Sequence, residues 1–244
     1  MAFQSVKLTH ANGKMYHLGI TEEQIAKKVI LIPDPQQVPL YAAFLDEARK
    51  VGEHREYVTY TGSFEGKPLS IMSCGFGCMP IAIAVEELNH LGVKELLKID
   101  CCPAIGTELK PGELCAASGA VRGEYASREY VHVSYPAVTD MSLMRRLLKQ
   151  GIKKIGLFRS HDVRSLETPA TVQGRQRIAR WAELGVQVLD GETSAMLVIA
   201  SVLKLKAASL ALVEENYTTA DSAPLQEEGK KRLFQAAARA LLCE

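Results

Sequence analysis

The residues best suited to chemistry stand directly after predicted strands. Asp190-Gly191-Glu192 sets two carboxylates around a glycine, and Asp100-Cys101-Cys102-Pro103 sets a carboxylate beside two thiols. Ionised carboxylates accept charge-assisted hydrogen bonds, which suits them to the polar groups of a ligand. The structural alternative is that Asp190 caps a helix and Glu192 occupies its first turn. Further segments of this kind are Pro33-Asp34-Pro35, Gly75-Phe76-Gly77, Ser160-His161-Asp162 and Glu214-Glu215-Asn216.

Short apolar runs alternate with amphipathic segments, and these elements must position the polar residues. The pattern predicts strands at 29–32, 57–64, 69–74, 95–99, 113–121, 154–158, 186–189 and 208–213. It predicts helices from Pro80 onward and at 141–149, 171–184, 192–203 and 225–242. We therefore expect an α/β fold: a three-layer sandwich with a mostly parallel, mixed central sheet flanked by helices. Ligands bind such sheets at the carboxyl ends of the strands.

Length and composition favour one domain over residues 1–244. The 244 residues are 47% hydrophobic and 23% charged, and no repeat or linker interrupts them. The 29 Lys and Arg residues nearly balance 28 Asp and Glu residues, so we expect no nucleic-acid partner. The apolar stretch at 194–203 is shorter than the roughly 20 residues that a bilayer requires, and residues 1–13 lack an apolar signal core. We expect no membrane association and a cytoplasmic location.

The six cysteines predict neither a disulfide framework nor a metal site. Cys74 and Cys78 are four residues apart, whereas Cys101 and Cys102 are adjacent and poorly placed for one tetrahedral zinc. We expect these thiols to pack as small apolar groups.

Six short motifs share their order and spacing with one known family. They are Tyr16-His17-Leu18-Gly19-Ile20, His54-Arg55-Glu56-Tyr57, Ser73-Cys74-Gly75-Phe76-Gly77, Ile83-Ala84-Val85-Glu86-Glu87-Leu88, Pro111-Gly112-Glu113 and Tyr135-Pro136-Ala137-Val138. The chain thereby resembles the purine nucleoside phosphorylase and uridine phosphorylase family, and its uridine phosphorylase branch most closely. The resemblance implies the fold of that family. It also implies a reaction in which phosphate, the co-substrate, attacks a nucleoside and releases the base and ribose 1-phosphate without a cofactor.

The resemblance assigns the ribose to Glu192, with Asp190 and Gly191 beside it. A methionine that accompanies this glutamate in the family is absent here, because Gly191 takes its place. His17 matches a family histidine that reaches the ribose 5′-hydroxyl across a subunit boundary. The alternative is an ordinary surface histidine.

The predicted phosphate site departs from the family pattern. Gln37 stands where the family has an arginine, and Lys98 replaces a second arginine, so bidentate geometry is lost. Arg55 is retained and matches an arginine donated by a neighbouring subunit. Cys101 replaces a hydroxyl donor, and Asp100 adds a negative charge close to the expected dianion. The resemblance therefore implies weakened phosphate binding through Arg55 and Lys98.

Base recognition is the least defined part of the pattern. Arg164 is the candidate for contacting the base, and the alternative is a solvated loop charge. The family also holds a monovalent cation between subunits near Glu56, but a serine expected to assist is Pro80 here, which argues against that cation.

Three functions are compatible with these residues. The first is an active nucleoside phosphorylase, close to uridine phosphorylase, and the second is a hydrolytic nucleosidase that uses water in place of phosphate. The third is a noncatalytic family member that serves as a ligand-binding or structural subunit. The roles implied for His17 and Arg55 also predict a homo-oligomer, either a dimer or a hexamer built from dimers.

Overall fold

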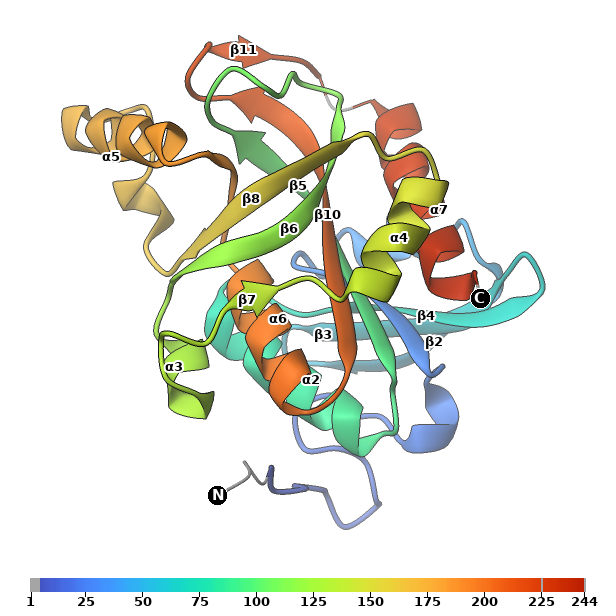
Figure 1. Ribbon diagram of the computed structural model, residues 1–244. Coiled ribbons are helices and arrows are strands. Elements are labelled where there is room, and N and C mark those ends of the chain that lie inside the picture. Colours follow the sequence, from blue (N-terminus) through green and yellow to red (C-terminus); the bar gives the residue numbers. More distant parts are fainter. Residues whose placement is uncertain (1–4, 225, 244) are drawn as a thin grey trace.

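The computed structural model describes residues 5–224 and 226–243 (Figure 1), and its strands there form one mixed sheet. The strands are β1 (Lys28–Ile32), β2 (Asp46–His54), β3 (Tyr57–Phe64), β4 (Lys67–Ser73), β5 (Glu95–Ala104), β6 (Leu114–Gly123), β7 (Ala137–Val138), β8 (Lys154–His161), β9 (Val186–Asp190), β10 (Lys206–Asn216) and β11 (Asp221–Ser222). The helices are α1 (Val38–Ala42), α2 (Cys78–His90), α3 (Ala126–Tyr130), α4 (Met141–Lys149), α5 (Val172–Glu183), α6 (Thr193–Val202) and α7 (Glu227–Leu242), with short 3₁₀ turns at Glu22–Gln24 and Arg164–Leu166.

Parallel pairing dominates the middle of the sheet. Strand β1 lies between β4 and β5, and β5 also pairs in parallel with β10 over most of its length. Strands β6, β8 and β9 form a second parallel set, which joins β10 through an antiparallel β6–β10 ladder. Because β9 also pairs with β5, the strands β5, β10, β6, β8 and β9 close into a ring. Their buried side chains are mostly small, including Cys102, Ala117 and Ala211 around Phe158.

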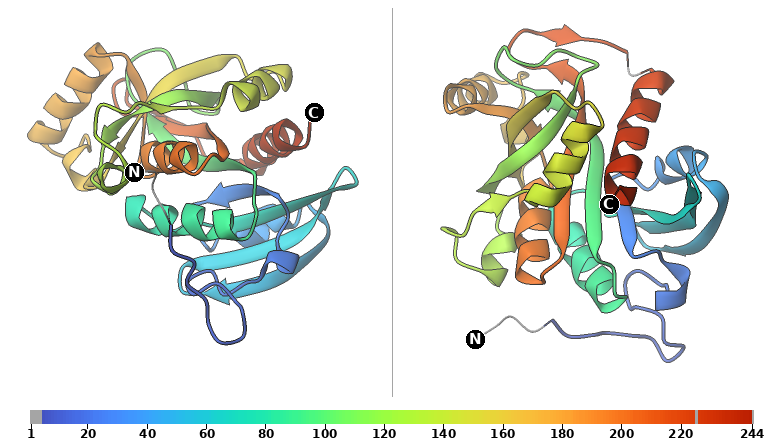
Figure 2. Two further views of the ribbon diagram at one scale, coloured as in Figure 1. Left: turned by 60° about the horizontal axis from the view of Figure 1, so that its bottom comes forward. Right: turned by 45° about the vertical axis from the view of Figure 1, so that its right-hand side comes forward.

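Helices cover both faces of the sheet, as the alternation of elements predicts. Helices α2 and α6 pack on one face with α3 beside them, and α4 and α7 pack together on the other face (Figures 1 and 2). The apolar strand residues alternate accordingly, because successive side chains of a strand point to opposite faces. In β1, Ile30 belongs to the α7 side and Leu31 to the α2 side.

The α/β fold class is confirmed, and the structure differs from the prediction at several elements. Strand β2 was not predicted, because its mostly exposed sequence DEARKVGEH has no apolar alternation and it pairs only at the sheet edge with β3. Asp100-Cys101-Cys102-Pro103 lies inside β5, where a loop is expected, because β10 continues to pair with this segment. Helix α2 begins at Cys78, two residues before Pro80.

Two further expectations can be compared with the described residues. Cys74, Cys78, Cys102 and Cys115 are buried free thiols, as expected, whereas Cys101 and Cys243 are partly exposed. Within residues 5–224 and 226–243, no helix is both long and apolar enough to cross a membrane.

Candidate functional site

A buried lysine surrounded by carboxylates forms the centre of the candidate site. Lys98 is fully buried, and its Nζ lies 3.0 Å from Asp190 Oδ2, 3.1 Å from Glu192 Oε2 and 3.3 Å from Asp100 Oδ2. Lys98 and Asp100 point to the same face of β5 because they are two residues apart in the strand. Asp190 ends β9 and Glu192 precedes α6, so the strand ends bring these groups together.

Hydrogen bonds fix the two carboxylates of the β9–α6 connection. Asp190 accepts from Ser160 Oγ at 2.6 Å and from the backbone N–H of Thr193 at 3.2 Å, in addition to the Thr193 hydroxyl. Glu192 Oε1 accepts from the backbone N–H of Gly77 at 2.8 Å, immediately before α2. Gly77 has a φ of 90°, a conformation that favours glycine, so the Gly75-Phe76-Gly77 turn presents its N–H to the carboxylate.

One oxygen of this cluster remains without a hydrogen bond. Among the described residues, the buried Glu192 Oε2 has no hydrogen-bond partner, although the Lys98 ammonium lies within ion-pair distance of it. A buried acceptor of this kind is costly unless another donor occupies the site. Glu192 Oε2 is thus held by the charge of Lys98 rather than by a directed hydrogen bond.

The charges in this cluster shift the pKa of two of its members. Burial, supported by Asp190 and Asp100, raises the pKa of Glu192 above its ordinary value, and Lys98 opposes that shift. Burial alone lowers the pKa of Lys98, but the three carboxylates around it outweigh burial and raise it well above the usual range. Lys98 therefore stays charged, and the three carboxylates around it outnumber its single positive charge.

Arg164 lines a cavity next to Asp190. The cavity has a volume of about 250 Å³, and its lining residues are Pro103, His161, Arg164, Ser165, Glu167, Thr168, Leu189, Asp190 and Tyr217. Burial lowers the pKa of Arg164, but the nearby Cys102, Tyr217, Asp100 and Glu192 outweigh burial and raise the pKa above its ordinary value. Arg164 is an exposed residue, and its side chain stands at the edge of this cavity.

The segment that carries Arg164 is anchored by a buried ion pair. Glu167 accepts from Arg159 at 2.8 Å, and the Arg159 guanidinium lies over the ring of Trp181 at 4.0 Å. Arg177 contacts the same carboxylate at 3.4 Å and donates to His161 Nε2 at 3.2 Å. These contacts hold both ends of the connection between β8 and α5 over the cavity.

His17 lies in the N-terminal segment and is held by Glu87 of α2. Its Nδ1 lies 2.7 Å from Glu87 Oε1, and the backbone N–H groups of His17 and Leu18 also donate to this carboxylate. Glu87 therefore shapes the loop that carries His17.

Arg55 and Cys101 occupy different surroundings from the Lys98 cluster. Arg55 is exposed in the turn between β2 and β3, with its guanidinium 5.7 Å from the centre of the Tyr16 ring. Cys101 packs against the apolar core beneath α7, on the face of β5 opposite Lys98. Burial, Asp100 and Glu214 raise the pKa of the Cys101 thiol to about 12.

The structure adds residues that the sequence pattern left unassigned. The sequence points to Ser160, because it follows the predicted strand 154–158. Its hydrogen bond to Asp190, however, depends on the pairing of β8 with β9. Lys230 of α7 has no such sign in the sequence: its Nζ donates to Gln37 Oε1 at 3.0 Å, and its charge acts on Cys101. A cation from the far end of the chain thus lies beside position 37.

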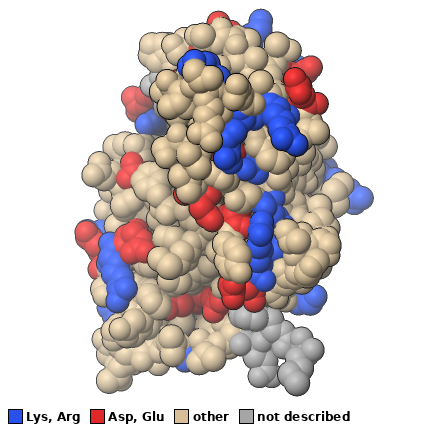
Figure 3. All heavy atoms as spheres, turned by 90° about the vertical axis from the view of Figure 1, so that its left-hand side faces the viewer, with Lys and Arg blue, Asp and Glu red and all other residues tan. Residues whose placement is uncertain are grey.

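On the face that carries α5, acidic and basic side chains are interspersed (Figure 3).

Comparison with known proteins identifies the family. Residues 27–243 match the model of the Phosphorylase superfamily. The chain belongs to this family. It is 39% identical to a uridine phosphorylase of Thermococcus kodakarensis over 56% of this chain and 50% of that protein. It is 30% identical to the Treponema pallidum uridine phosphorylase over 87% of this chain and 86% of the relative. The crystal structure of uridine phosphorylase from Vibrio fischeri matches with a TM-score of 0.84 at 26% identity, covering 97% of this chain and 100% of that one.

Proposed function

We propose that this member of the Phosphorylase superfamily is a nucleoside phosphorylase of the uridine phosphorylase type. It cleaves the N-glycosidic bond of a nucleoside with phosphate and yields the free base and ribose 1-phosphate. The observation that carries the proposal is Glu192, a buried carboxylate with one oxygen fixed by the backbone N–H of Gly77 and the other, without a hydrogen bond of its own, facing the Lys98 ammonium. The similarity to uridine phosphorylases over most of the chain supports the choice of reaction.

In this proposal the nucleoside spans the Glu192 cluster and the neighbouring cavity. Glu192 orients the ribose through its hydroxyl groups, and Asp190 keeps Lys98 and α6 in place. The base extends toward Arg164, whose positive charge favours the negative charge that develops on a departing base. Holding both ends of the substrate fixes the bond to be broken relative to the incoming phosphate.

Phosphate binding is the step that the charges of this site favour least. Lys98 faces three carboxylates, so a phosphate anion has to compete with Asp100 for the ammonium group. Lys230 compensates in part, because it brings a cation to Gln37, where the family arginine is missing. We propose that phosphate binds at this rim next to Lys98, that Lys230 contributes its charge from beside Gln37 on the other face of β5, and that Arg55 of a neighbouring subunit completes the site.

The assay for this proposal is release of uracil from uridine with and without phosphate. The expected result is release that requires phosphate and gives ribose 1-phosphate in equal amount. A Glu192→Gln variant keeps the shape of the side chain and removes its charge, so we expect a large loss of kcat/KM. Absence of cleavage under all conditions, with the protein folded, would contradict the proposal.

Hydrolysis is a second candidate because of the excess of carboxylates around Lys98. A site with three carboxylates and one buried cation repels a dianion but accepts water readily. In that case uracil release proceeds at the same rate in phosphate-free buffer, and the sugar product is ribose. The same assay separates the two reactions by their sugar product.

A homo-oligomer with shared sites is part of the proposal. The exposed position of Arg55 in the β2–β3 turn supports its use by a neighbouring subunit. The test mixes two impaired variants, Arg55→Ala and Glu192→Gln, after dissociation and reassembly. Shared sites regain activity, because some interfaces then combine an intact Arg55 with an intact Glu192. No recovery in mixed oligomers would show that each chain carries a complete site.

A further inference from the structure

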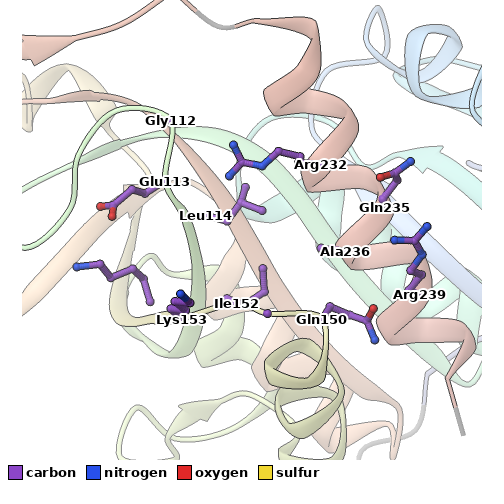
Figure 4. A pocket seen from close by; sticks show the side chains of 12 residues that line it. Gly112, Glu113, Leu114, Gln150, Ile152, Lys153, Arg232, Gln235, Ala236 and Arg239 are labelled. Carbon is purple, nitrogen blue, oxygen red and sulfur yellow. The ribbon is translucent and has the colours of Figure 1, made fainter.

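A cationic cleft lies at the opposite end of β6 and β8 from the Lys98 cluster. Its volume is about 410 Å³, within the range of small-molecule sites. Figure 4 shows its lining residues, which are Gly112, Glu113, Leu114, Gln150, Gly151, Ile152, Lys153, Lys154, Arg232, Gln235, Ala236 and Arg239. Strand β8 runs from Lys154 in the cleft to Ser160 at the candidate active site, a distance of roughly 20 Å at 3.3 Å per residue.

Helix α7 directs a row of polar side chains into this cleft. Arg232, Gln235 and Arg239 follow one another at the spacing of a single helical face and line the cleft, and Arg232 extends toward Leu114 at the start of β6 (Figure 4). The opposite faces of α7 are buried and apolar, with Phe234 and Leu241 in the core. The polar row is therefore a separate face of the helix.

The cations of the cleft outnumber its acidic groups. Four basic side chains line it, whereas Glu113 is its single acidic lining residue. Glu113 already accepts the backbone N–H of Lys110 at 2.8 Å, and Arg239 pairs with Glu65 outside the cleft at 2.8 Å. Within the part of the chain that the structure describes, Lys153 and Arg232 have no acidic partner.

The remaining lining residues favour an organic ligand over a bare ion. Leu114, Ile152 and Ala236 form an apolar surface between the cations. Gln150 and Gln235 add amide groups that donate and accept hydrogen bonds. A guanidinium binds phosphate through two parallel hydrogen bonds, and an ammonium binds it as a point charge.

We propose that this cleft is a second binding site, separate from the nucleoside site, for an organic phosphate of mononucleotide size. Arg232 and Lys153 bind the phosphate group, the two glutamines bind polar groups of the organic part, and the apolar surface packs against its ring or sugar. The site does not depend on the reaction proposed above, because it shares no lining residue with the Lys98 cluster or with the cavity beside Asp190.

The experiment measures binding of uridine 5′-monophosphate and of inorganic phosphate by titration calorimetry with the full chain at low ionic strength. The cleft variant carries Arg232→Gln and Lys153→Gln. Its matched control carries Arg180→Gln and Lys94→Gln, two exposed cations outside the cleft, so both variants lose the same charge. A third variant, Glu192→Gln, reports binding at the candidate active site.

We expect the cleft variant to bind the mononucleotide at least tenfold more weakly than the control variant, while Glu192→Gln leaves this binding event unchanged. We also expect inorganic phosphate to bind at least tenfold more weakly than the mononucleotide.

Equal binding by the cleft and control variants overturns the proposal, as does loss of binding in Glu192→Gln alone. Equal affinity for phosphate and mononucleotide overturns the assignment of an organic ligand. Thermal unfolding of each variant verifies that it is folded.

Discussion

Replacing Asp100 by asparagine tests whether the carboxylates around Lys98 limit phosphate binding. Asp100 Oδ2 lies 3.3 Å from Lys98 Nζ, and Asp100 Oδ1 accepts the backbone N–H of Cys101 at 2.8 Å. Asparagine retains an oxygen for the bond from Cys101 and removes the negative charge. Lys98 keeps Asp190 and Glu192 as partners, so its buried ammonium stays compensated.

The size of the effect follows from these distances. A phosphate oxygen bound to Lys98 Nζ at about 2.8 Å lies no more than about 6 Å from the Asp100 carboxylate. At an effective dielectric constant of about 20, two unit charges at that separation repel by roughly 3 kcal/mol. The side chain of Asp100 is 25% exposed, so solvent screens part of this repulsion. We expect Asp100→Asn to tighten phosphate binding by about 1.4 to 3 kcal/mol, which is roughly tenfold to a hundredfold.

The assay compares initial rates over a range of phosphate concentrations at saturating uridine. The expected result is a lower KM for phosphate in Asp100→Asn, with calorimetry of phosphate binding as an independent measure. Asp46→Asn is the matched control, because it makes the same charge change on the exposed edge strand β2. An unchanged or higher KM for phosphate in Asp100→Asn, with the variant folded, refutes the electrostatic argument.

Three further predictions concern pH, a second cation and a helix cap. Burial, with Asp190 and Asp100, raises the pKa of Glu192, so kcat/KM for the nucleoside should fall as the pH drops through that raised value. Asp100→Asn removes one cause of the shift and should move this acidic limb of the pH profile to lower pH; a limb that stays in place argues against Glu192 as the titrating group. Lys230→Gln should raise the KM for phosphate at least fivefold with little change in kcat, whereas the same substitution at the exposed Lys231 should leave both constants unchanged. Partial burial raises the pKa of Asp140, but hydrogen bonds from Ser142 and the start of α4 outweigh it and lower that pKa. Asp140→Ala should therefore cost about 1 kcal/mol of unfolding free energy at neutral pH. Since the folded pKa is the lower one, this difference should shrink as pH falls through it, and equal unfolding curves at pH 7 contradict the cap.

The core elements are readable from local sequence because burial imposes a periodicity on them. Strand β1 is a run of apolar residues, and the apolar spacing from Ile81 to Leu88 predicts α2. Strand β2 shows the opposite case. Its side chains are mostly exposed, and it is a strand because β3 offers an edge for hydrogen bonding rather than because of its own residue pattern.

The boundary of β5 explains why the site itself was only partly predictable. A polar segment after an apolar run predicts a loop, but Asp100-Cys101-Cys102-Pro103 stays extended because β10 pairs with it through Ala104. The extended backbone points Asp100 toward Lys98 and Cys101 toward α7. The alternation of side chains in a strand therefore separates two adjacent residues that the sequence places together.

The sequence by itself determined the α/β architecture and the strand-end position of Asp190 and Glu192. These follow from local composition and from the order of motifs. Only the tertiary structure decided that Lys98 meets three carboxylates and that Lys230 reaches Gln37 from α7. The physical reason is that the balance of charge in a buried site depends on groups brought together by strand pairing and helix packing, and residues 193 positions apart carry no local sign of such a contact.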